Sequence, residues 1–279
     1  METRIWSKTR QVIVGPEHPA VIIGERINPT GKRRLAASLL EKDMGRVRGL
    51  ARSQVEQGAA VLDINVGAAG VDEVELLPLA VKAVCEVTDV PLCLDSPNVE
   101  ALRAALDVYE GKALINSVNG EEKKLEQVLP LVKEYGAAVI ALTMDDSGIP
   151  SDAPTRVAIA AKIVERAEAL GIPRHDVIID CLALAVCADC RTAMVTLEAI
   201  RGVREQLGVN MTLGASNISF GLPDRESVNE FFLAMALLAG VNAPIADPRC
   251  SRKVVLISDL LLGRDEFGMA YVTYCRQHR

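Results

Sequence analysis

The sequence is poor in aromatic residues and in histidine. Aromatic side chains make up 3% of the 279 residues, and the chain contains only three histidines. Its core must therefore be built from aliphatic side chains, since hydrophobic residues still account for 49% of the chain. The shortage of histidine weighs against a histidine-rich metal site and against a Ser-His-Asp triad, so we expect no metal centre.

The sequence also has no hydrophobic run long enough to cross a bilayer. The most apolar helical stretch, FFLAMALLAG at residues 231–240, is about half as long as a membrane-spanning helix. No secretory apolar segment follows Met1 and the number of cysteines, seven, is odd, so we expect a reduced, cytoplasmic protein. A net charge of −6 weighs against general binding to nucleic acid or to an acidic membrane.

Short apolar runs recur along the whole chain, each continuous and rich in Val, Ile and Leu. They cover residues 20–28, 60–67, 90–96, 112–119, 137–145, 176–184, 210–220 and 243–248. Such runs are typical of strands buried on both faces of a parallel sheet. Helical patterns lie between them, over residues 43–57, 121–135, 154–170, 191–207 and 225–239.

This alternation predicts an α/β protein with a single (β/α)8 barrel, a TIM barrel, over residues 20–279. Residues 1–19 form an N-terminal extension in this interpretation. A doubly wound sheet is the alternative, but the sequence lacks a G-x-G-x-x-G motif after its first apolar run.

Polar side chains gather late in the predicted strands. In chain order they are Glu25, Arg26, Asn28, Asp63, Asn65, Asp95, Ser96, Asn116, Ser117, Asn119, Thr143, Asp145, Asp180, Ser216, Asn217 and Asp247. Any one Asp or Asn could simply cap the helix that follows it. Barrel enzymes, however, carry their chemistry at the C-terminal ends of the strands, where all these residues would meet. A rim of amides and carboxylates without histidine suits a neutral heterocycle with N–H donors and ring acceptors.

The motifs at these strand ends resemble those of the pterin-binding methyltransferases. The segments are IIGERINPTG (22–31), LDINVG (62–67), LCLDS (92–96), INSVN (115–119), LTMDDSGIP (142–150) and GASNIS (214–219). In order and spacing they are most similar to the methyltetrahydrofolate:corrinoid protein methyltransferases, whose folate-binding barrel also occurs in cobalamin-dependent methionine synthase. The resemblance covers roughly residues 20–248 and implies a TIM barrel.

The resemblance implies roles for individual residues. Matched by motif, Asp95, Asn116 and Asp180 would hold the aminopyrimidinone edge of the pterin, and Asn217 would be the catalytic residue at the N5 nitrogen. Ser216 and Asp63 are weaker matches as neighbours in substrate binding.

The match to the family is imperfect after the sixth strand. The family usually has a proline after the aspartate, whereas Cys181 stands there in this chain, which leaves the shape of the following loop open. Cys181, Cys187 and Cys190 could ligate zinc, but no fourth ligand is evident nearby, so we interpret them as buried or loop thiols.

The implied reaction is methyl transfer between tetrahydrofolate, or 5-methyltetrahydrofolate, and the cobalt of a corrinoid (cobalamin). The chain has no D-x-H-x-x-G corrinoid motif, so the corrinoid should arrive on a partner protein that docks over the barrel mouth. An O-demethylase or similar one-carbon system is the expected setting. The alternatives are a folate-binding protein without turnover and an enzyme like dihydropteroate synthase, which would need a lysine near Asn217.

Two further features stay open at this stage. The basic cluster Lys32-Arg33-Arg34 is either a solvated first helical turn or a site for an anionic tail or an acidic partner. The segment at 229–240 is more apolar than a wholly exposed barrel helix requires, so we expect a homodimer. Packing of that segment against residues 1–19 is the alternative.

Overall fold

Eight parallel strands close into a barrel in the computed structural model, which describes residues 1–278. The strands are β3 (Ile23–Ile27), β4 (Val61–Asn65), β5 (Leu92–Asp95), β6 (Leu114–Asn119), β7 (Ala138–Leu142), β8 (Val177–Asp180), β9 (Met211–Gly214) and β10 (Ala243–Ala246). They follow chain order around the barrel, and β10 pairs with both β9 and β3. The predicted single-domain TIM barrel is confirmed.

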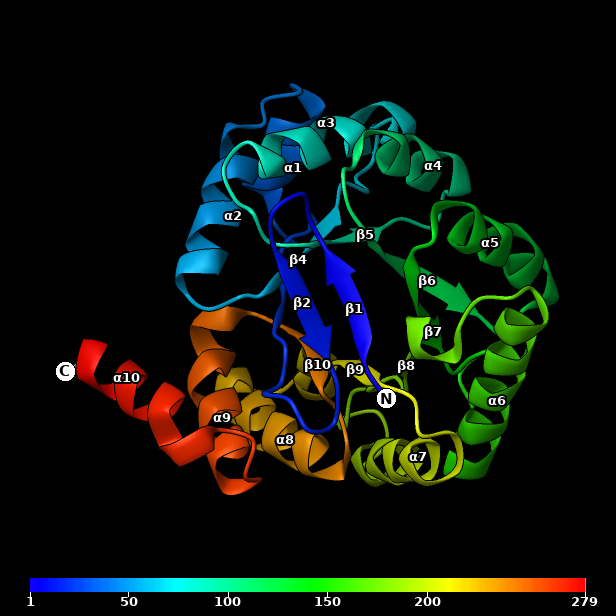
Figure 1. Cartoon of the computed structure of the whole chain (residues 1–279), viewed down its shortest axis with the longest axis vertical. Helices are drawn as coiled ribbons and strands as arrows, with labels where there is room; N and C mark the ends of the chain where they lie inside the picture. The colour runs from blue at the N-terminus through cyan, green and yellow to red at the C-terminus, as the bar shows by residue number, and fades with distance from the viewer. Residues whose placement is uncertain (279) are drawn as a thin grey trace.

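A ring of helices surrounds the barrel (Figure 1). They are α1 (Arg33–Leu40), α2 (Gly45–Glu56), α3 (Glu73–Cys85), α4 (Val99–Val108), α5 (Glu122–Tyr135), α6 (Ala153–Ala169), α7 (Thr192–Leu207), α8 (Arg225–Ala239), α9 (Pro248–Leu261) and α10 (Met269–Gln277). The short 3-10 helices are η1 (Arg174–Asp176), η2 (Ala215–Ser219) and η3 (Glu266–Gly268). All five helices predicted from the sequence are present.

Side chains on the barrel strands alternate between the interior and the surrounding helices. The apolar side chains of the interior include Ile23, Val61, Cys93, Leu114, Ile140, Ile178 and Ala243. Residues two positions further along a strand point the same way, nearer its C-terminal end. These residues include Glu25, Asp63, Asp95, Asn116 and Asp180. The strand period therefore brings five of the predicted polar residues to one place.

An antiparallel hairpin covers the opposite end of the barrel. It consists of β1 (Thr3–Trp6) and β2 (Gln11–Val14) and lies across the barrel in Figure 1. Ile5 and Val12 belong to the same buried apolar cluster as the barrel interior. Asn210, just before β9, donates to Thr3 Oγ1 at 2.8 Å and fixes the hairpin at the N-terminal end of the strands. Because the hairpin covers the N-terminal end, a ligand can enter the barrel only from the C-terminal end of its strands.

The apolar segment at 229–240 forms most of α8, and part of it faces outward. Phe231 is 76% exposed, Leu238 60% and Met235 47%. The N-terminal hairpin lies on the end of the barrel and leaves these side chains exposed.

Within residues 1–278, no helix combines the length and the apolar character that a membrane crossing requires. The same residues contain no group of three or more His, Cys, Asp and Glu arranged to hold a metal ion.

Candidate functional site

Two carboxylates and two amides from neighbouring strands form two hydrogen-bonded pairs that lie side by side inside the barrel mouth. Asn116 Nδ2 on β6 donates to Asp63 Oδ1 on β4 at 3.1 Å. Asn65 Nδ2 on β4 donates to Asp95 Oδ2 on β5 at 2.9 Å. The strand register places Asp95 beside both Asn65 and Asn116. Each amide thus has one carboxylate partner. The Asn65 oxygen also accepts from the Gly67 N–H at 2.8 Å, whereas the Asn116 side-chain oxygen has no partner within residues 1–278.

Burial makes the carboxylates of this group weak acids. Asp63 is 3% exposed, and its burial, with the nearby charge of Asp95, raises its pKa well above the ordinary value. Burial likewise raises the pKa of Asp95, while the hydrogen bond from Asn65 acts in the opposite direction. Two buried carboxyl groups this close disfavour double ionisation. The group therefore offers both a proton donor and a proton acceptor to a ligand.

Asp180 lies across the barrel mouth, at the end of β8. Its Oδ1 accepts from the backbone N–H of Leu182 at 2.7 Å, and its Oδ2 accepts from that of Gly214 at 3.4 Å. Burial raises its pKa to about 6 despite these two hydrogen bonds. The longer of the two leaves Oδ2 able to accept from a ligand.

The loop after β8, where the family's usual proline is missing, is held by a buried arginine. Arg156 on α6 is 1% exposed and donates to the backbone oxygens of Cys181 and Leu182, both at 2.8 Å. Leu182 has a φ of +60°, a left-handed conformation that costs a non-glycine residue about 1–2 kcal/mol. The arginine stabilises this conformation and thereby positions Asp180. The sequence contains no motif that would have singled out Arg156.

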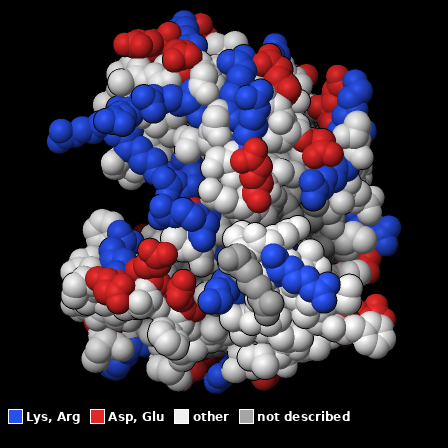
Figure 2. All heavy atoms as spheres, turned by 90° about the vertical axis from the view of Figure 1, so that its left-hand side faces the viewer, with Lys and Arg blue, Asp and Glu red and all other residues white. Residues whose placement is uncertain are grey.

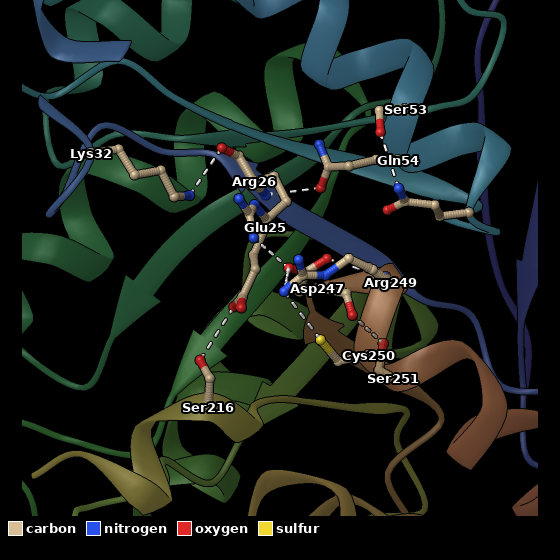
Figure 3. Close-up of polar contacts among 11 residues, drawn as sticks. Glu25, Arg26, Lys32, Ser53, Gln54, Ser216, Asp247, Arg249, Cys250 and Ser251 are labelled. Carbon is tan, nitrogen blue, oxygen red and sulfur yellow. Dashed lines mark hydrogen bonds and ion pairs between the residues drawn. The ribbon is translucent and has the colours of Figure 1, made fainter. Parts of the chain in front are cut away.

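Glu25 and Ser216 face each other at another part of the mouth (Figure 3). Ser216 Oγ donates to Glu25 Oε2 at 3.4 Å, and burial raises the pKa of Glu25. Both line a cavity of about 430 Å³ that extends to Asp247. Glu25 was not among the residues assigned to the site from sequence, although its place at the end of a strand was a visible signal.

Arg26 and Asp247 link β3 to α9 beside this cavity (Figure 3). Arg26 Nη1 donates to Asp247 Oδ2, and Asp247 also caps α9 by accepting from the Arg249 N–H at 3.1 Å. For Asp247 the simple interpretation as a helix cap is therefore correct. Asn119 likewise acts locally, since its side chain accepts from the Glu121 N–H at 3.1 Å and lies at the start of α5.

Asn217 differs from the other candidate residues in being exposed. It lies in η2, directly after β9, at the outer edge of the mouth. A Cβ atom added to Gly214 would lie 3.3 Å from Asn217 Nδ2, so this amide sits against the glycine whose N–H faces Asp180. Within residues 1–278 the Asn217 side chain makes no hydrogen bond. Its amide is thus free to serve a ligand bound above Asp180.

The structure divides the six predicted site residues into three sets. Asn116 is hydrogen-bonded to Asp63 and lies beside Asp95 in the strand register. Asp180 and Asn217 meet at Gly214, and Ser216 pairs with Glu25. All six lie within a barrel strand or directly after one, on β4, β5, β6 and β8 and in η2. Asp63 and Asp180 are buried, Asp95 and Asn116 are half-buried, and Asn217 is exposed.

The three cysteines of the 181–190 loop are separated in the structure. Cys181 is buried, whereas Cys187 and Cys190 are exposed. The Cys187 thiol donates to the backbone oxygen of Phe220 at 2.9 Å, so it serves to hold the loop beside η2.

Sequence comparison connects this site to known proteins. Residues 24–247 match the model of a family described as "Pterin binding enzyme". The methylcorrinoid:tetrahydrofolate methyltransferase of Eubacterium limosum is 32% identical over 265 residues, which span 92% of this chain and 96% of that protein. The methionine synthase of Mycobacterium tuberculosis is 32% identical over 238 residues, and there the match spans 81% of this chain but only 20% of the larger protein.

Solved structures show the same fold at lower sequence identity. Yersinia pestis dihydropteroate synthase with a pterin–sulfa conjugate has a TM-score of 0.70 at 16% identity, and the match covers 93% of this chain and 98% of that one. The Thermus thermophilus dihydropteroate synthase has a TM-score of 0.67 at 22% identity, covering 93% of this chain and all of the other. These similarities concern the fold alone.

Proposed function

The chain belongs to the pterin-binding enzyme family, and from that premise we propose that it is a methyltransferase acting on tetrahydrofolate and a corrinoid. The methyl group moves between the N5 nitrogen of tetrahydrofolate and the cobalt of a corrinoid carried by a separate protein. A relative matched over 96% of its own length, the methylcorrinoid:tetrahydrofolate methyltransferase, supports this reaction. The single structural observation that carries the proposal is the exposed, unpaired amide of Asn217 beside a buried set of recognition groups.

Pterin recognition is assigned to the buried groups. A pterin presents an amino group and a ring N–H on one edge, with a ring nitrogen and a carbonyl oxygen beside them. Asp95 and Asp180 accept from the N–H groups when ionised, and the Asn116 amide meets the neighbouring ring atoms. Asp63 is a positioning residue in this proposal, because its Oδ1 accepts a hydrogen bond from Asn116 Nδ2 at 3.1 Å and so fixes the orientation of that amide.

Methyl transfer places a demand on the N5 nitrogen. A tertiary amine is a poor leaving group unless its nitrogen is protonated or accepts a hydrogen bond. The Asn217 amide donates to N5, and this hydrogen bond strengthens as negative charge develops on the nitrogen. Asparagine cannot supply the proton itself, so its effect is to stabilise the transition state more than the bound substrate.

The open mouth of the barrel suits a corrinoid carried on another protein. When bound, the corrinoid supplies the cobalt that takes or gives the methyl group. Because Asn217 is exposed and the recognition carboxylates lie deeper, a pterin held by those carboxylates presents N5 outward, toward a docked partner. We further propose a cytoplasmic homodimer that serves as the second methyltransferase of an O-demethylase or a similar one-carbon system.

A non-catalytic folate-binding protein and an enzyme like dihydropteroate synthase are the competing functions. An amide at residue 217, where dihydropteroate synthase would need a lysine, favours the methyltransferase over the latter. The same amide weighs against a protein that only binds folate, because a hydrogen bond to N5 would assist the reaction more than it would assist recognition of the pterin.

A pair of matched variants tests the roles assigned to two asparagines. Asn217→Ala should slow methyl transfer from methylcobalamin to tetrahydrofolate about 100-fold or more, as loss of a hydrogen bond to a developing charge does, with folate affinity changed only a few-fold. Asn116→Ala removes the same kind of side chain from the recognition set and should chiefly weaken folate binding. If Asn217→Ala lowers affinity and rate by equal factors, its catalytic role is wrong.

A further inference from the structure

A groove lined by basic side chains lies next to the candidate site. Arg26, Lys32, Arg33, Arg34 and Arg46 line a space of about 680 Å³ between β3, α1 and α2. Figure 2 shows basic side chains gathered around the hollow on one side of the molecule, with acidic side chains on the opposite wall. Acidic residues of α8, Glu226 and Glu230, line the neighbouring cavity.

These cations have few partners in the protein. Of the five, only Arg26 forms an ion pair within residues 1–278, with Asp247. Lys32 Nζ donates to the backbone oxygen of Arg26 at 3.0 Å. Burial and the charge of Arg26 lower the pKa of Lys32, while the charges of Glu25 and Asp247 act in the opposite direction and only partly offset them. The groove therefore holds positive charge that an anionic ligand would stabilise.

The local structure does not explain the positive charge. Lys32, Arg33 and Arg34 stand at the N-terminus of α1, and the first turn contains no acidic residue and no side-chain cap. Cations at a helix N-terminus are unfavourable by about 0.3–1 kcal/mol each, because they oppose the helix dipole. Sequence alone left two interpretations of this cluster, and the geometry disfavours a merely solvated helical turn.

Arg26 connects the groove to the candidate site. It lines the groove, and its guanidinium group pairs with Asp247, which lines the neighbouring cavity together with Glu25 and Ser216. The tail of a folate is attached to the pterin ring at the carbon next to N5, which the proposed function places at Asn217. A tail that left the ring on this side would cross the cavity lined by Ser216 and Glu25 before it reached Arg26 and Lys32.

We propose that the groove binds the glutamyl tail of the folate, and in particular a poly-γ-glutamyl tail with several linked carboxylates. This inference rests on the proposed function and names the form of its substrate. Repeated carboxylates along one flexible chain match a row of cations along one groove. The acidic wall formed by α8 disfavours an anion on the other side of the mouth and directs the tail toward α1.

The test compares tetrahydrofolate carrying one glutamate with tetrahydrofolate carrying five γ-linked glutamates. For each protein the measured quantity is the ratio of the two dissociation constants at low ionic strength. Each exposed ion pair contributes little by itself, so several of them together should make the pentaglutamate bind about tenfold more tightly. Added salt should reduce this ratio, since the contacts are accessible to solvent.

A double variant and a matched control test whether the preference for the pentaglutamate arises in the groove. Arg33→Gln/Arg34→Gln removes two exposed charges from the groove and should bring the ratio to within about twofold of one. Arg52→Gln/Arg201→Gln removes two exposed arginines of α2 and α7 that do not line the groove, and should leave the ratio as in the wild type.

Three outcomes would overturn the inference, and they differ in what else they imply. A wild-type ratio near one would reject the groove as a tail site while leaving tetrahydrofolate binding intact. A high ratio that survives Arg33→Gln/Arg34→Gln would assign the tail elsewhere and leave the groove for another anionic partner, such as an acidic protein. Failure of the wild type to bind either substrate would reject the proposed function and this inference with it.

Discussion

Replacing Asp180 by asparagine tests the role of a buried carboxylate in pterin binding. In the folate-free protein burial raises the pKa of Asp180 to about 6, from an ordinary value of 3.8. The N–H donors of a pterin bind the ionised carboxylate and not the protonated one. Tetrahydrofolate binding should therefore weaken as the pH falls through about 6.

The size of the effect follows from the ionised fraction. With a pKa of about 6, roughly nine tenths of Asp180 is ionised at pH 7 and roughly one tenth at pH 5. This residue alone should lower the affinity about tenfold between those two pH values. Asp180→Asn removes the titrating group and two charge-assisted hydrogen bonds of about 1.5–3 kcal/mol each, so it should bind about 100-fold more weakly at pH 7.

The same pKa shift acts on the stability of the folate-free protein. Because the folded pKa is raised, ionising Asp180 costs folding free energy. The cost is absent below about pH 4, the unfolded pKa, and grows as the pH rises to about 6, to at most about 3 kcal/mol. Asparagine has nearly the same shape and keeps an oxygen that accepts from the Leu182 N–H. Asp180→Asn should therefore be more stable than the wild type at pH 7 and equally stable near pH 4.

Calorimetric titration with tetrahydrofolate between pH 5 and pH 7 measures the first effect, and urea unfolding at pH 4 and pH 7 measures the second. The difference between wild type and variant isolates Asp180 from other titrating groups, including those of the folate. Parallel pH profiles of affinity, together with a stability difference that does not change with pH, would refute the reasoning.

Two other predictions concern stability and assembly. Asp63→Asn should also stabilise the folate-free protein at neutral pH, because burial and the charge of Asp95 raise the pKa of Asp63. If the variant unfolds at a lower urea concentration than the wild type at pH 7, ionisation of Asp63 does not destabilise the folded protein. The outward apolar side chains of α8 should form a homodimer interface, since Phe231 and Leu238 are 76% and 60% exposed. Sedimentation at micromolar concentration should show a dimer that Phe231→Glu/Leu238→Glu dissociates, whereas a wild-type monomer would reject the interface.

Much of the fold could be predicted from periodicity. The eight apolar runs are the eight barrel strands because strands buried on both faces need continuous Val, Ile and Leu. The helix predicted over residues 43–57 begins at Gly45 in the structure, with Met44 as its N-cap residue, and the Asp43 side chain accepts from the Gly45 N–H at 2.8 Å. Pro130 lies within α5 and does not split it into two helices.

Other helices and strands were harder to predict from the sequence. Helix α3 follows a capping Asp72 but contains Pro78, and α4 spans only ten residues, so neither shows a long uninterrupted helical pattern. The hairpin formed by β1 and β2 could not be predicted from its own sequence, because its stability depends on the burial of Ile5 and Val12 against the barrel interior.

The candidate site was predictable in composition but not in geometry. The strand ends and the family motifs together pointed to Asp95, Asn116 and Asp180, since alternation along each strand turns all three toward the barrel interior. The hydrogen bonds between strands are not encoded in any local pattern. Arg156, which lies 25 residues before Cys181 and holds its carbonyl oxygen, depends on the packing of α6 against the loop after β8.

Methyl transfer from methylcobalamin to tetrahydrofolate tests the central claim most directly. The purified protein should convert tetrahydrofolate to 5-methyltetrahydrofolate while the methylcobalamin absorbance is lost in equal amount. The account predicts stoichiometric transfer that depends on Asn217, without condensation of a pterin pyrophosphate with p-aminobenzoate. A protein that binds tetrahydrofolate tightly but leaves methylcobalamin unchanged would contradict it.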